Sequence, residues 1–242
     1  MERSISIVIP FRDELDALPE LIRRLDLATT PLERWFEVIM VDDASTDGGS
    51  KIVERATRDR AWLKLIRLDS RGGQTGAFRA AFATAKGEWL IRIDADLQDD
   101  PRDLPKFLEK IDLGIDLIIG FRDQRQHRFA DKLLTAVYNL VLLLLFNPPV
   151  RSFSGSFVAF RTACVAGAPL WTNDHRYLPL IALRRGASQI EQVFVKHEAR
   201  TTGCSKYLTW KKFLLGPPEL LLFFIRYRLG LYDRREAGET PL

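Results

Sequence analysis

Short apolar runs alternate with segments of helical spacing through the first half of the chain. The runs are rich in aliphatic and β-branched side chains, as buried strands are. They cover residues 5–9, 36–41, 63–68, 89–93 and 116–120. Between them, apolar residues recur at helical intervals over residues 14–27, 47–56, 74–85 and 105–113. This alternation predicts an α/β fold with a mainly parallel sheet and helices on both of its faces.

The second half of the chain is less regular. Its pattern predicts helices over residues 128–146 and 177–183, and strands over residues 153–160, with a bend, and 190–195. The last part of the chain is predicted to be an amphipathic helical segment, apolar around Gly216-Pro217-Pro218. The apolar stretches at 140–146 and 220–225 are too short to span a bilayer on their own.

The composition excludes several classes of protein. Hydrophobic residues make up 46% and charged residues 28% of the 242 positions, which is ordinary for a globular chain. Cys164 and Cys204 are too few for a disulfide framework or a zinc cluster, so a reducing cytoplasmic setting is expected. The net charge of +4 suits phosphate ligands or anionic lipid headgroups. Because the sequence has no dense Lys/Arg block, no nucleic-acid partner is expected.

Two acidic clusters follow two of the predicted strands. Asp94-Ala95-Asp96-Leu97-Gln98-Asp99-Asp100-Pro101 comes after the run at 89–93, and Asp42-Asp43-Ala44-Ser45-Thr46-Asp47 comes after the run at 36–41. Ligands of an open α/β sheet bind at the carboxyl ends of its strands. Carboxylate oxygens there suit Mg²⁺ or Mn²⁺, which in turn binds a diphosphate. We therefore predict one nucleotide-diphosphate site built from several loops; the alternative is that each cluster caps the next helix.

Four segments resemble one family of enzymes. They are Pro10-Phe11-Arg12-Asp13-Glu14, VDDASTDGG at 41–49, RGGQTGAFRAAFATAKGEWLIRIDADLQDDP at 71–101 and RTTGCSKY at 200–207. They resemble the GT-A glycosyltransferases of family 2, and most closely the polyprenyl-phosphate branch, which is similar to dolichol-phosphate mannose synthase. RTTGCSKY matches the R-x-x-G-x-S-K-[YF] signature of that branch. The resemblance implies a Rossmann-like GT-A domain over residues 1–207, followed by a membrane-associating helical tail over residues 208–242.

The resemblance also implies a reaction. Such enzymes transfer a single sugar, with inversion at its anomeric carbon, from a nucleotide-diphosphate sugar to a polyprenyl phosphate such as undecaprenyl or dolichyl phosphate. The acceptor phosphate is ionised at neutral pH, so its attack needs no general base. The Q-x-x-R-W motif of polymerising family 2 synthases is absent from the sequence, which favours transfer of a single sugar. The expected location is the cytoplasmic face of the membrane, with the protein peripheral and its oligomeric state open.

Individual roles follow from the same resemblance. Asp96 and Gln98 are expected to bind Mg²⁺ or Mn²⁺, and Asp94 to orient the ribose or a metal-bound water. The nucleobase and ribose are expected to contact Pro10, Arg12, Glu14, Asp42 and Asp43. The phosphate groups are expected to contact Arg122, Arg200 and Lys206, with Lys132 at a position where the family has an arginine. The predicted catalytic set is Asp96, Arg122, Arg200 and Lys206.

Several residues keep two interpretations. Asp47 is either a nucleotide contact or the N-cap of the next helix. Arg71-Gly72-Gly73 either brings backbone close to the nucleotide or forms a plain turn. Asp174 and His175 belong to a segment similar to the family's acidic-x-H-R pattern, and they either touch the sugar or begin a helix. Ser152 lies where the family has an acidic segment near the sugar.

The tail is predicted to lie at a membrane surface. Its apolar patch is flanked by Lys211, Lys212, Arg226 and Arg228. The alternative is that the patch packs into the core or into an oligomer interface. Two other functions stay open, a glycosyltransferase of the same fold with a hydroxyl acceptor and a non-catalytic nucleotide-binding membrane scaffold. A dehydrogenase or a P-loop NTPase is not expected, because the sequence has neither G-x-G-x-x-G after its first strand nor G-x-x-x-x-G-K-[ST].

Overall fold

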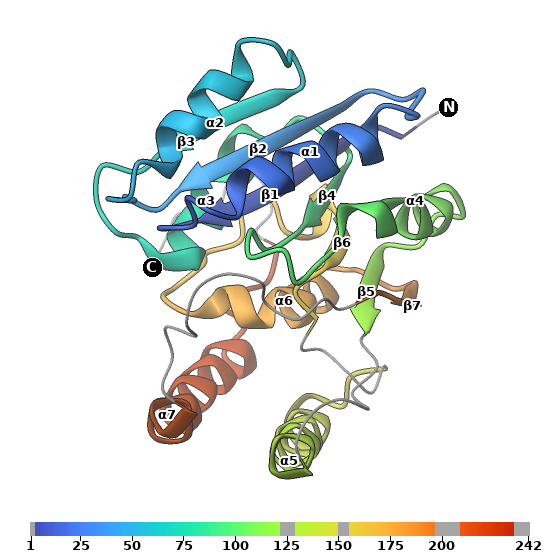
Figure 1. Cartoon of the computed structure of the whole chain (residues 1–242). Helices are drawn as coiled ribbons and strands as arrows, with labels where there is room; N and C mark the ends of the chain where they lie inside the picture. The colour runs from blue at the N-terminus through green and yellow to red at the C-terminus, as the bar shows by residue number, and fades with distance from the viewer. Residues whose placement is uncertain (1–2, 122–128, 150–154, 197–208, 235–242) are drawn as a thin grey trace.

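One sheet runs through the whole fold. The structure, a computed structural model, describes the backbone of residues 3–121, 129–149, 155–196 and 209–234, and the side chains of the same residues except 129–135 and 209–217. Within these ranges seven strands are ordered β3-β2-β1-β4-β6-β5-β7 (Figure 1). They are β1 Ile5–Phe11, β2 Phe36–Asp42, β3 Leu63–Arg67, β4 Trp89–Arg92, β5 Leu117–Phe121, β6 Val158–Arg161 and β7 Ile190–Phe194. Only β6 runs antiparallel to its neighbours, so the predicted mainly parallel sheet is confirmed.

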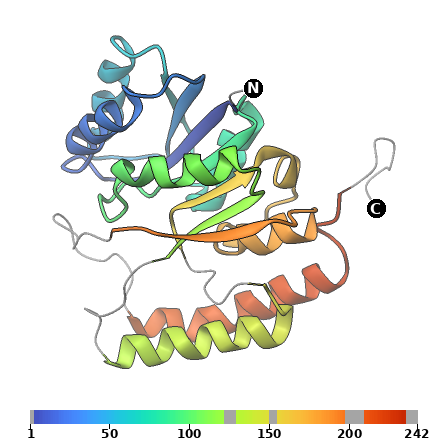
Figure 2. The same ribbon diagram turned by 90° about the vertical axis from the view of Figure 1, so that its right-hand side faces the viewer.

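Helices cover both faces of the sheet, as predicted. One face carries α1 Leu18–Thr29, α2 Gly49–Thr57 and α4 Leu104–Asp112, and the other carries α3 Gly73–Thr84 and α6 Leu178–Arg184. Short 3₁₀ turns are η1 Pro101–Asp103, η3 Thr162–Cys164 and η4 Asp174–Tyr177. Two longer helices, α5 Phe129–Phe146 and α7 Thr209–Arg228, lie side by side beyond α6 (Figures 1 and 2). They add a further layer on that side of the molecule.

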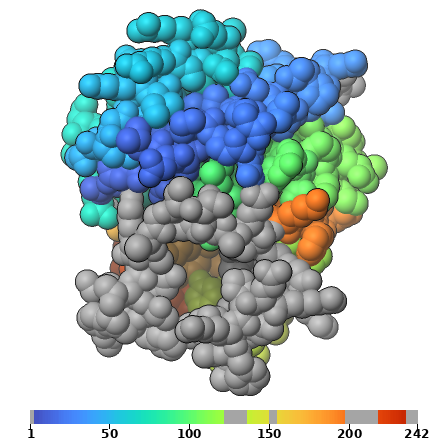
Figure 3. Space-filling view, in the orientation of Figure 1, coloured from blue at the N-terminus to red at the C-terminus, as the bar shows by residue number. Residues whose placement is uncertain are grey.

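The alternation of side chains along the strands divides the core into two clusters. In β1, Ile7 and Ile9 point into the cluster under α1 and α4, whereas Val8 points into the cluster under α3 and α6. Because both faces are covered, every residue of β1 is buried, and the strand is apolar in sequence except for Ser6. In the space-filling view, the blue N-terminal segments and the green α4 segment form a continuous surface over the upper part of one face (Figure 3).

Most predicted boundaries agree with the structure to within two residues, with two exceptions. The helix predicted from Glu14 begins at Leu18, because the Glu14 carbonyl accepts hydrogen bonds from the N–H groups of Ala17 and Leu18 and forms a turn first. The strand predicted over 153–160 is Val158–Arg161. The described residues before it, 155–157, lie outside the strand.

The predicted C-terminal helix is confirmed, and its inner face joins the second core cluster. α7 continues through Gly216-Pro217-Pro218 without a break. Leu220 and Phe223 are buried, and the Phe223 ring stacks on Tyr177 of η4 at 4.2 Å between ring centroids. Among the helices in the described part of the chain, none is both long enough and apolar enough to cross a bilayer.

Candidate active site

The loops that follow β1, β2 and β4 meet at one edge of the sheet. These strands are neighbours in the order β2-β1-β4 and run parallel, so their carboxyl ends lie together. Each loop holds a non-glycine residue with a positive φ angle, namely Asp13 at 49°, Ala44 at 56° and Leu97 at 63°. Left-handed backbone is costly for residues with a side chain and gathers at functional sites. The edge therefore has the backbone features of a binding site.

The first two loops are fastened to each other by their own polar groups. Asp13 Oδ1 accepts a hydrogen bond from Thr46 N at 2.8 Å, and Asp13 N donates to Ser45 Oγ at 3.0 Å. Asp42 is buried and its Oδ1 accepts from Ser45 N at 2.8 Å. These bonds hold the β1 and β2 loops as one rigid wall of the site.

Asp47 supports the same wall. Its Oδ2 accepts from Leu15 N at 2.7 Å and its Oδ1 from Gly49 N at 2.8 Å. The N-cap position of α2 is occupied by Gly48, whose φ of 88° suits glycine. The interpretation of Asp47 as the N-cap residue was therefore wrong, because Gly48 is the N-cap. The Asp47 carboxylate still accepts a hydrogen bond from the first N–H of the helix, but from one residue further away.

Asp43 joins the end of β2 to the start of α3. Its carboxylate is buried, and Oδ1 accepts hydrogen bonds from Gly72 N at 2.6 Å and Gly73 N at 3.0 Å. Gly73 has a φ of 65°, and a Cβ on Gly72 would lie 3.2 Å from Gly76 Cα. The Arg71-Gly72-Gly73 turn therefore wraps around Asp43. Among the described residues, Asp43 Oδ2 has no hydrogen-bond donor, so it is the oxygen left for a ligand.

The acidic motif after β4 divides its side chains between the site and the core. Asp94, Asp96 and Gln98 are half-buried at the edge of the sheet, whereas Ala95 and Leu97 are buried. Asp96 Oδ1 accepts from Gln98 N at 3.2 Å, which closes a tight turn around the left-handed Leu97. The three residues predicted to serve the metal and the ribose are therefore the residues of this turn that keep contact with solvent.

The last two acidic residues of the motif are structural. Asp99 is fully buried and accepts a hydrogen bond from Ser156 Oγ at 2.5 Å. Asp100 accepts from Arg102 N at 3.0 Å and Arg102 Nε at 2.8 Å, and Arg24 lies 3.6 Å away. Burial alone would raise the pKa of Asp100, but the hydrogen bonds from Arg102 and the charge of Arg24 lower it. Both carboxylates fix the motif to the rest of the fold.

The half-buried carboxylates Asp94 and Asp96 fit a divalent cation that shares its ligands with a phosphate. Mg²⁺ is commonly held by one or two carboxylates, with substrate phosphates and water completing its shell. Asp94 and Asp96 supply two carboxylates of the required kind, and Gln98 adds an amide oxygen. Among the described residues no group of three or more His, Cys, Asp or Glu could hold a metal alone. A cation here would therefore depend on the diphosphate for its remaining ligands.

Arg92 and His175 close the site on the side of η4. Arg92 is buried, its Nη1 donates to the His175 carbonyl at 3.0 Å and its Nη2 lies 3.4 Å from Asp94 Oδ1. His175 Nδ1 lies 2.9 Å from Thr75 Oγ1 in the first turn of α3. Burial lowers the pKa of His175 to about 3, with a further contribution from the Arg92 and Arg176 charges, so the ring is neutral at neutral pH.

Sequence analysis missed the part that Arg92 and Thr75 play here. The sequence pattern placed Arg92 in an apolar strand and assigned it no role. An arginine at the end of such a strand was the signal that could have indicated a role, because arginine is rarely buried unless it is paired. Asp174, in contrast, is buried and accepts from Trp171 N and Tyr232 Oη, each at 2.8 Å. Because the Asp174 side chain lies in the core, His175 is the one of these two residues that faces the site.

The remaining predicted residues have different positions. Pro10 is buried within β1, and Arg12 and Glu14 are half-buried in the loop that follows it. Arg12 Nε donates to Asp13 Oδ2 at 3.3 Å. The predicted phosphate contacts Arg122, Arg200 and Lys206, together with Ser152 and the side chain of Lys132, lie outside the described residues. Their roles stay predictions.

Two curated proteins that are similar to this chain in sequence carry the same name. An undecaprenyl-phosphate 4-deoxy-4-formamido-L-arabinose transferase of Klebsiella pneumoniae (strain 342) is 29% identical over 206 residues, which cover 85% of this chain and 63% of that protein. A protein of the same name from Pseudomonas fluorescens is 30% identical over 204 residues, covering 84% of this chain and 60% of that protein. The chain thus spans less than two thirds of the length of these relatives.

Solved structures share the fold. Glucosyl-3-phosphoglycerate synthase from Mycobacterium tuberculosis, in complex with Mn²⁺ and uridine-diphosphate-glucose, aligns with a TM-score of 0.69 at 18% identity, over 98% of this chain and 81% of that chain. S. aureus TarS 1-349 aligns with a TM-score of 0.59 at 21% identity, over 80% of this chain and 60% of that chain. The predicted GT-A fold is confirmed by these neighbours.

The sequence profile of one family covers the elements that build the site. It matches residues 6–166, from β1 through the acidic motif to the turn after β6. The profile is that of Glycosyl transferase family 2, and this chain belongs to that family.

Proposed function

We propose that this protein is an inverting glycosyltransferase that moves a single sugar from a nucleotide-diphosphate sugar to a polyprenyl phosphate. The observation that carries the proposal is the pair of half-buried carboxylates, Asp94 and Asp96, at the same strand edge as Asp43, whose Oδ2 has no donor among the described residues. The names of the similar curated proteins, which are undecaprenyl-phosphate sugar transferases, support the acceptor.

The donor half of the site suits a nucleotide diphosphate. Asp43 Oδ2 offers a charged acceptor to a ribose hydroxyl or a base N–H. Asp96, with Asp94 and Gln98 beside it, would hold Mg²⁺ or Mn²⁺ against the diphosphate. When bound, the cation supplies charge stabilisation for the leaving nucleoside diphosphate. A related structure that holds Mn²⁺ together with uridine-diphosphate-glucose supports this arrangement.

Neutral His175 suits the sugar side of the donor. Its ring lies within hydrogen-bond distance of Thr75 Oγ1, and its pKa, lowered mainly by burial, leaves it uncharged at neutral pH. An uncharged imidazole can donate or accept a hydrogen bond to a sugar hydroxyl without a proton transfer. The acceptor phosphate then attacks the anomeric carbon as an anion, and no protein group has to remove a proton from it.

The exposed faces of α5 and α7 suit contact with a membrane, where a polyprenyl phosphate resides. On α5, Val137, Leu140 and Leu144 are 50%, 53% and 75% exposed. On α7, Leu221 and Ile225 continue the apolar surface. Exposed apolar stripes on neighbouring helices mark an interaction surface, and an interfacial helix buries such a stripe among lipid headgroups. Peripheral attachment to the cytoplasmic face is part of the proposal.

A donor and acceptor screen tests the proposal. GDP- and UDP-sugars, and a nucleotide-linked 4-deoxy-4-formamido-L-arabinose, are incubated with undecaprenyl phosphate in vesicles and Mg²⁺ or Mn²⁺. One donor is expected to yield a glycolipid, and Asp59→Asn, which removes an exposed charge in the turn after α2, serves as the control variant. Transfer only to a soluble hydroxyl acceptor would overturn the lipid acceptor, and binding without transfer would favour a scaffold.

A further inference from the structure

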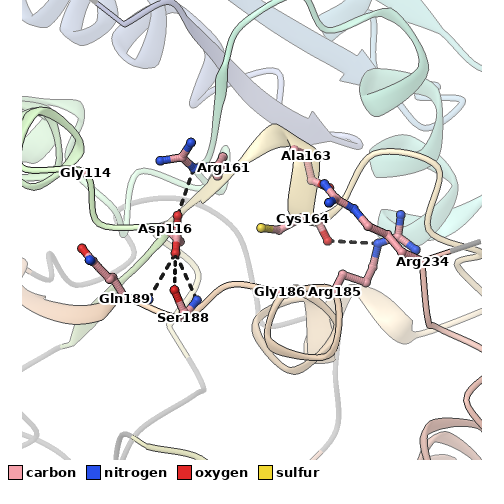
Figure 4. Close-up of a pocket in the computed structure, with 10 residues that line it drawn as sticks. All are labelled: Gly114, Asp116, Arg161, Ala163, Cys164, Arg185, Gly186, Ser188, Gln189 and Arg234. Atoms are coloured by element: carbon pink, nitrogen blue, oxygen red, sulfur yellow. Dashed lines mark hydrogen bonds and ion pairs between the residues drawn. The ribbon is translucent and has the colours of Figure 1, made fainter. Parts of the chain in front are cut away.

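A second polar pocket lies at the edge of the sheet opposite the candidate active site. It is formed by the residues before β5 and β7, the end of the antiparallel β6 and the end of α6 (Figure 4). The pocket has a volume of about 390 Å³, which is within the usual range for small-molecule sites. Its charged lining residues are Asp116, Arg161, Arg185 and Arg234.

Arg185 brings a buried positive charge to this pocket without a carboxylate bonded to it. The residue is 7% exposed, and within the described part of the chain its guanidinium donates only to backbone carbonyl groups. The acceptors are Cys164 O at 3.1 Å, Ala166 O at 2.7 Å, Tyr232 O at 3.1 Å and Asp233 O at 3.3 Å. Buried charges in proteins are usually paired with an opposite charge. Burial, and next the charge of Arg234, lower the pKa of Arg185, while the charge of Asp233, which is paired with Arg184, opposes them.

The single carboxylate of the pocket is already fully used. Asp116 accepts from Arg161 Nε at 2.9 Å, from Ser188 N at 3.0 Å and Oγ at 3.1 Å, and from Gln189 N at 3.2 Å (Figure 4). One carboxylate therefore faces three guanidinium groups. The pocket has an excess of two positive charges, and no second carboxylate lines it in the described part of the chain.

Two of the three arginines have N–H donors that no group in the described part of the chain accepts, and these are available to a ligand. Arg161 uses Nε for Asp116 and stacks over the Trp89 ring at 4.7 Å, which leaves the N–H groups of Nη1 and Nη2. Arg234 donates from Nη2 to Ala163 O at 2.7 Å and keeps its other donors. Guanidinium groups with free N–H pairs match the oxygens of a phosphate group in geometry as well as in charge.

We infer that this pocket binds the phosphate group of a soluble phosphorylated small molecule. A phosphate monoester carries close to two negative charges at neutral pH, which matches the excess of the pocket. The volume leaves room for an organic part beside the phosphate. Because the pocket and the candidate active site lie at opposite edges of the sheet, a ligand here would not occupy the donor site, and the inference does not depend on the proposed reaction.

Calorimetric titration with inorganic phosphate and with pyrophosphate tests the inference. It is done in EDTA, so that no divalent cation supports binding at the acidic motif. The variants are Arg234→Gln, Arg234→Lys and Arg161→Gln/Arg234→Gln, and the control is Arg58→Gln, which removes an exposed arginine far from the pocket. Wild type and Arg58→Gln are expected to bind alike, Arg234→Gln about tenfold more weakly, and the double variant more weakly still. Arg234→Lys should fall between wild type and Arg234→Gln.

Local and lipid readouts complete the test. Phosphate is expected to slow backbone hydrogen exchange over residues 184–189 in wild type and to have no such effect in the double variant, whose circular dichroism and Tm report whether it is folded. Equal phosphate affinity in wild type and the folded double variant would overturn the inference. A different outcome is that free phosphate does not bind, whereas wild type binds phosphatidylglycerol vesicles and the double variant does not. That result would overturn the soluble ligand in favour of a lipid headgroup.

Discussion

Asp43 Oδ1 lies 2.6 Å from Gly72 N, and this contact orients the carboxylate that closes the candidate donor site. One oxygen of Asp43 is used to hold the turn before α3, and the other stays available. A rigid, pre-oriented acceptor loses little freedom when it binds a ligand. The geometry of this turn also explains why glycine residues stand at 72 and 73. A Cβ on Gly72 would lie close to Gly76 Cα, and the positive φ of Gly73 is unfavourable for a residue with a side chain.

Asp43→Asn is expected to weaken binding of the nucleotide. A charge-assisted hydrogen bond contributes about 1.5–3 kcal/mol, so the dissociation constant for the preferred nucleoside diphosphate should rise by roughly 10- to 150-fold. Isothermal titration of wild type, Asp43→Asn and the exposed-site control Asp59→Asn measures this. Equal affinity in all three proteins would show that Asp43 only supports the loop.

Asp96→Asn and Asp99→Asn should have opposite effects, although both lie in one motif. Asp96 is half-buried at the site, so its variant should keep its Tm but lose binding of Mn²⁺ in the presence of nucleoside diphosphate. Asp99 is fully buried on Ser156, so its variant should lose about 1–3 kcal/mol of the free energy of unfolding and still bind Mn²⁺. Electron paramagnetic resonance of Mn²⁺ and thermal unfolding separate the two. A metal response that is the same in both variants would contradict the assignment of Asp96.

His175 should make the folded state less stable in mild acid. Its pKa is about 3 in the folded protein and about 6.5 when unfolded, so between these values the unfolded state binds more protons than the folded state. Stability therefore falls as the pH drops below about 6.5, by at most about 1.4 kcal/mol per pH unit from this residue. Urea unfolding of wild type and His175→Gln from pH 7.5 to 5 checks it. The variant should show the shallower slope, and parallel curves would count against a depressed pKa.

Charges on the exposed faces of α5 and α7 should reduce attachment to membranes. Leu144 and Leu221 are 75% and 59% exposed, so Leu144→Glu/Leu221→Glu should leave the fold intact while removing apolar contact with lipid. The control is Leu113→Glu, at a leucine that is 64% exposed after α4 and away from this helix pair. Flotation with anionic vesicles should recover wild type and Leu113→Glu and leave the double variant behind. Equal flotation of all three proteins would place the membrane contact elsewhere.

The fold followed from the sequence because its determinants are local. The runs at 5–9 and 89–93 are apolar except for Ser6 and Arg92, and helices cover both faces of the strands that they form. The start of α1 was misplaced because Leu15 fits the helical spacing, whereas the chain first forms a turn in which the N–H groups of Ala17 and Leu18 donate to the Glu14 carbonyl. Periodicity reports which face is apolar and not where the chain first turns.

The candidate site was only partly predictable for a related reason. Asp94 and Asp96 stand at a strand end and could be found from their position, as could Asp43. The different roles of the carboxylates within the acidic motif were not visible in the sequence, because the hydrogen bond between Asp99 and Ser156 joins residues 57 positions apart. The contact of His175 with Thr75 spans 100 positions and depends on the packing of η4 against α3. Such pairs arise from tertiary structure and leave no local pattern.

Mass spectrometry of the lipid product tests the central claim most directly. Wild-type protein is incubated with the preferred nucleotide sugar, Mn²⁺ and undecaprenyl phosphate in vesicles, beside Asp96→Asn and the control Asp59→Asn. The account predicts a lipid heavier by one sugar residue with wild type and Asp59→Asn, lost on chelation of the metal and reduced by about 100-fold or more in Asp96→Asn. Release of free sugar without any glycolipid, or full glycolipid formation by Asp96→Asn, would contradict it.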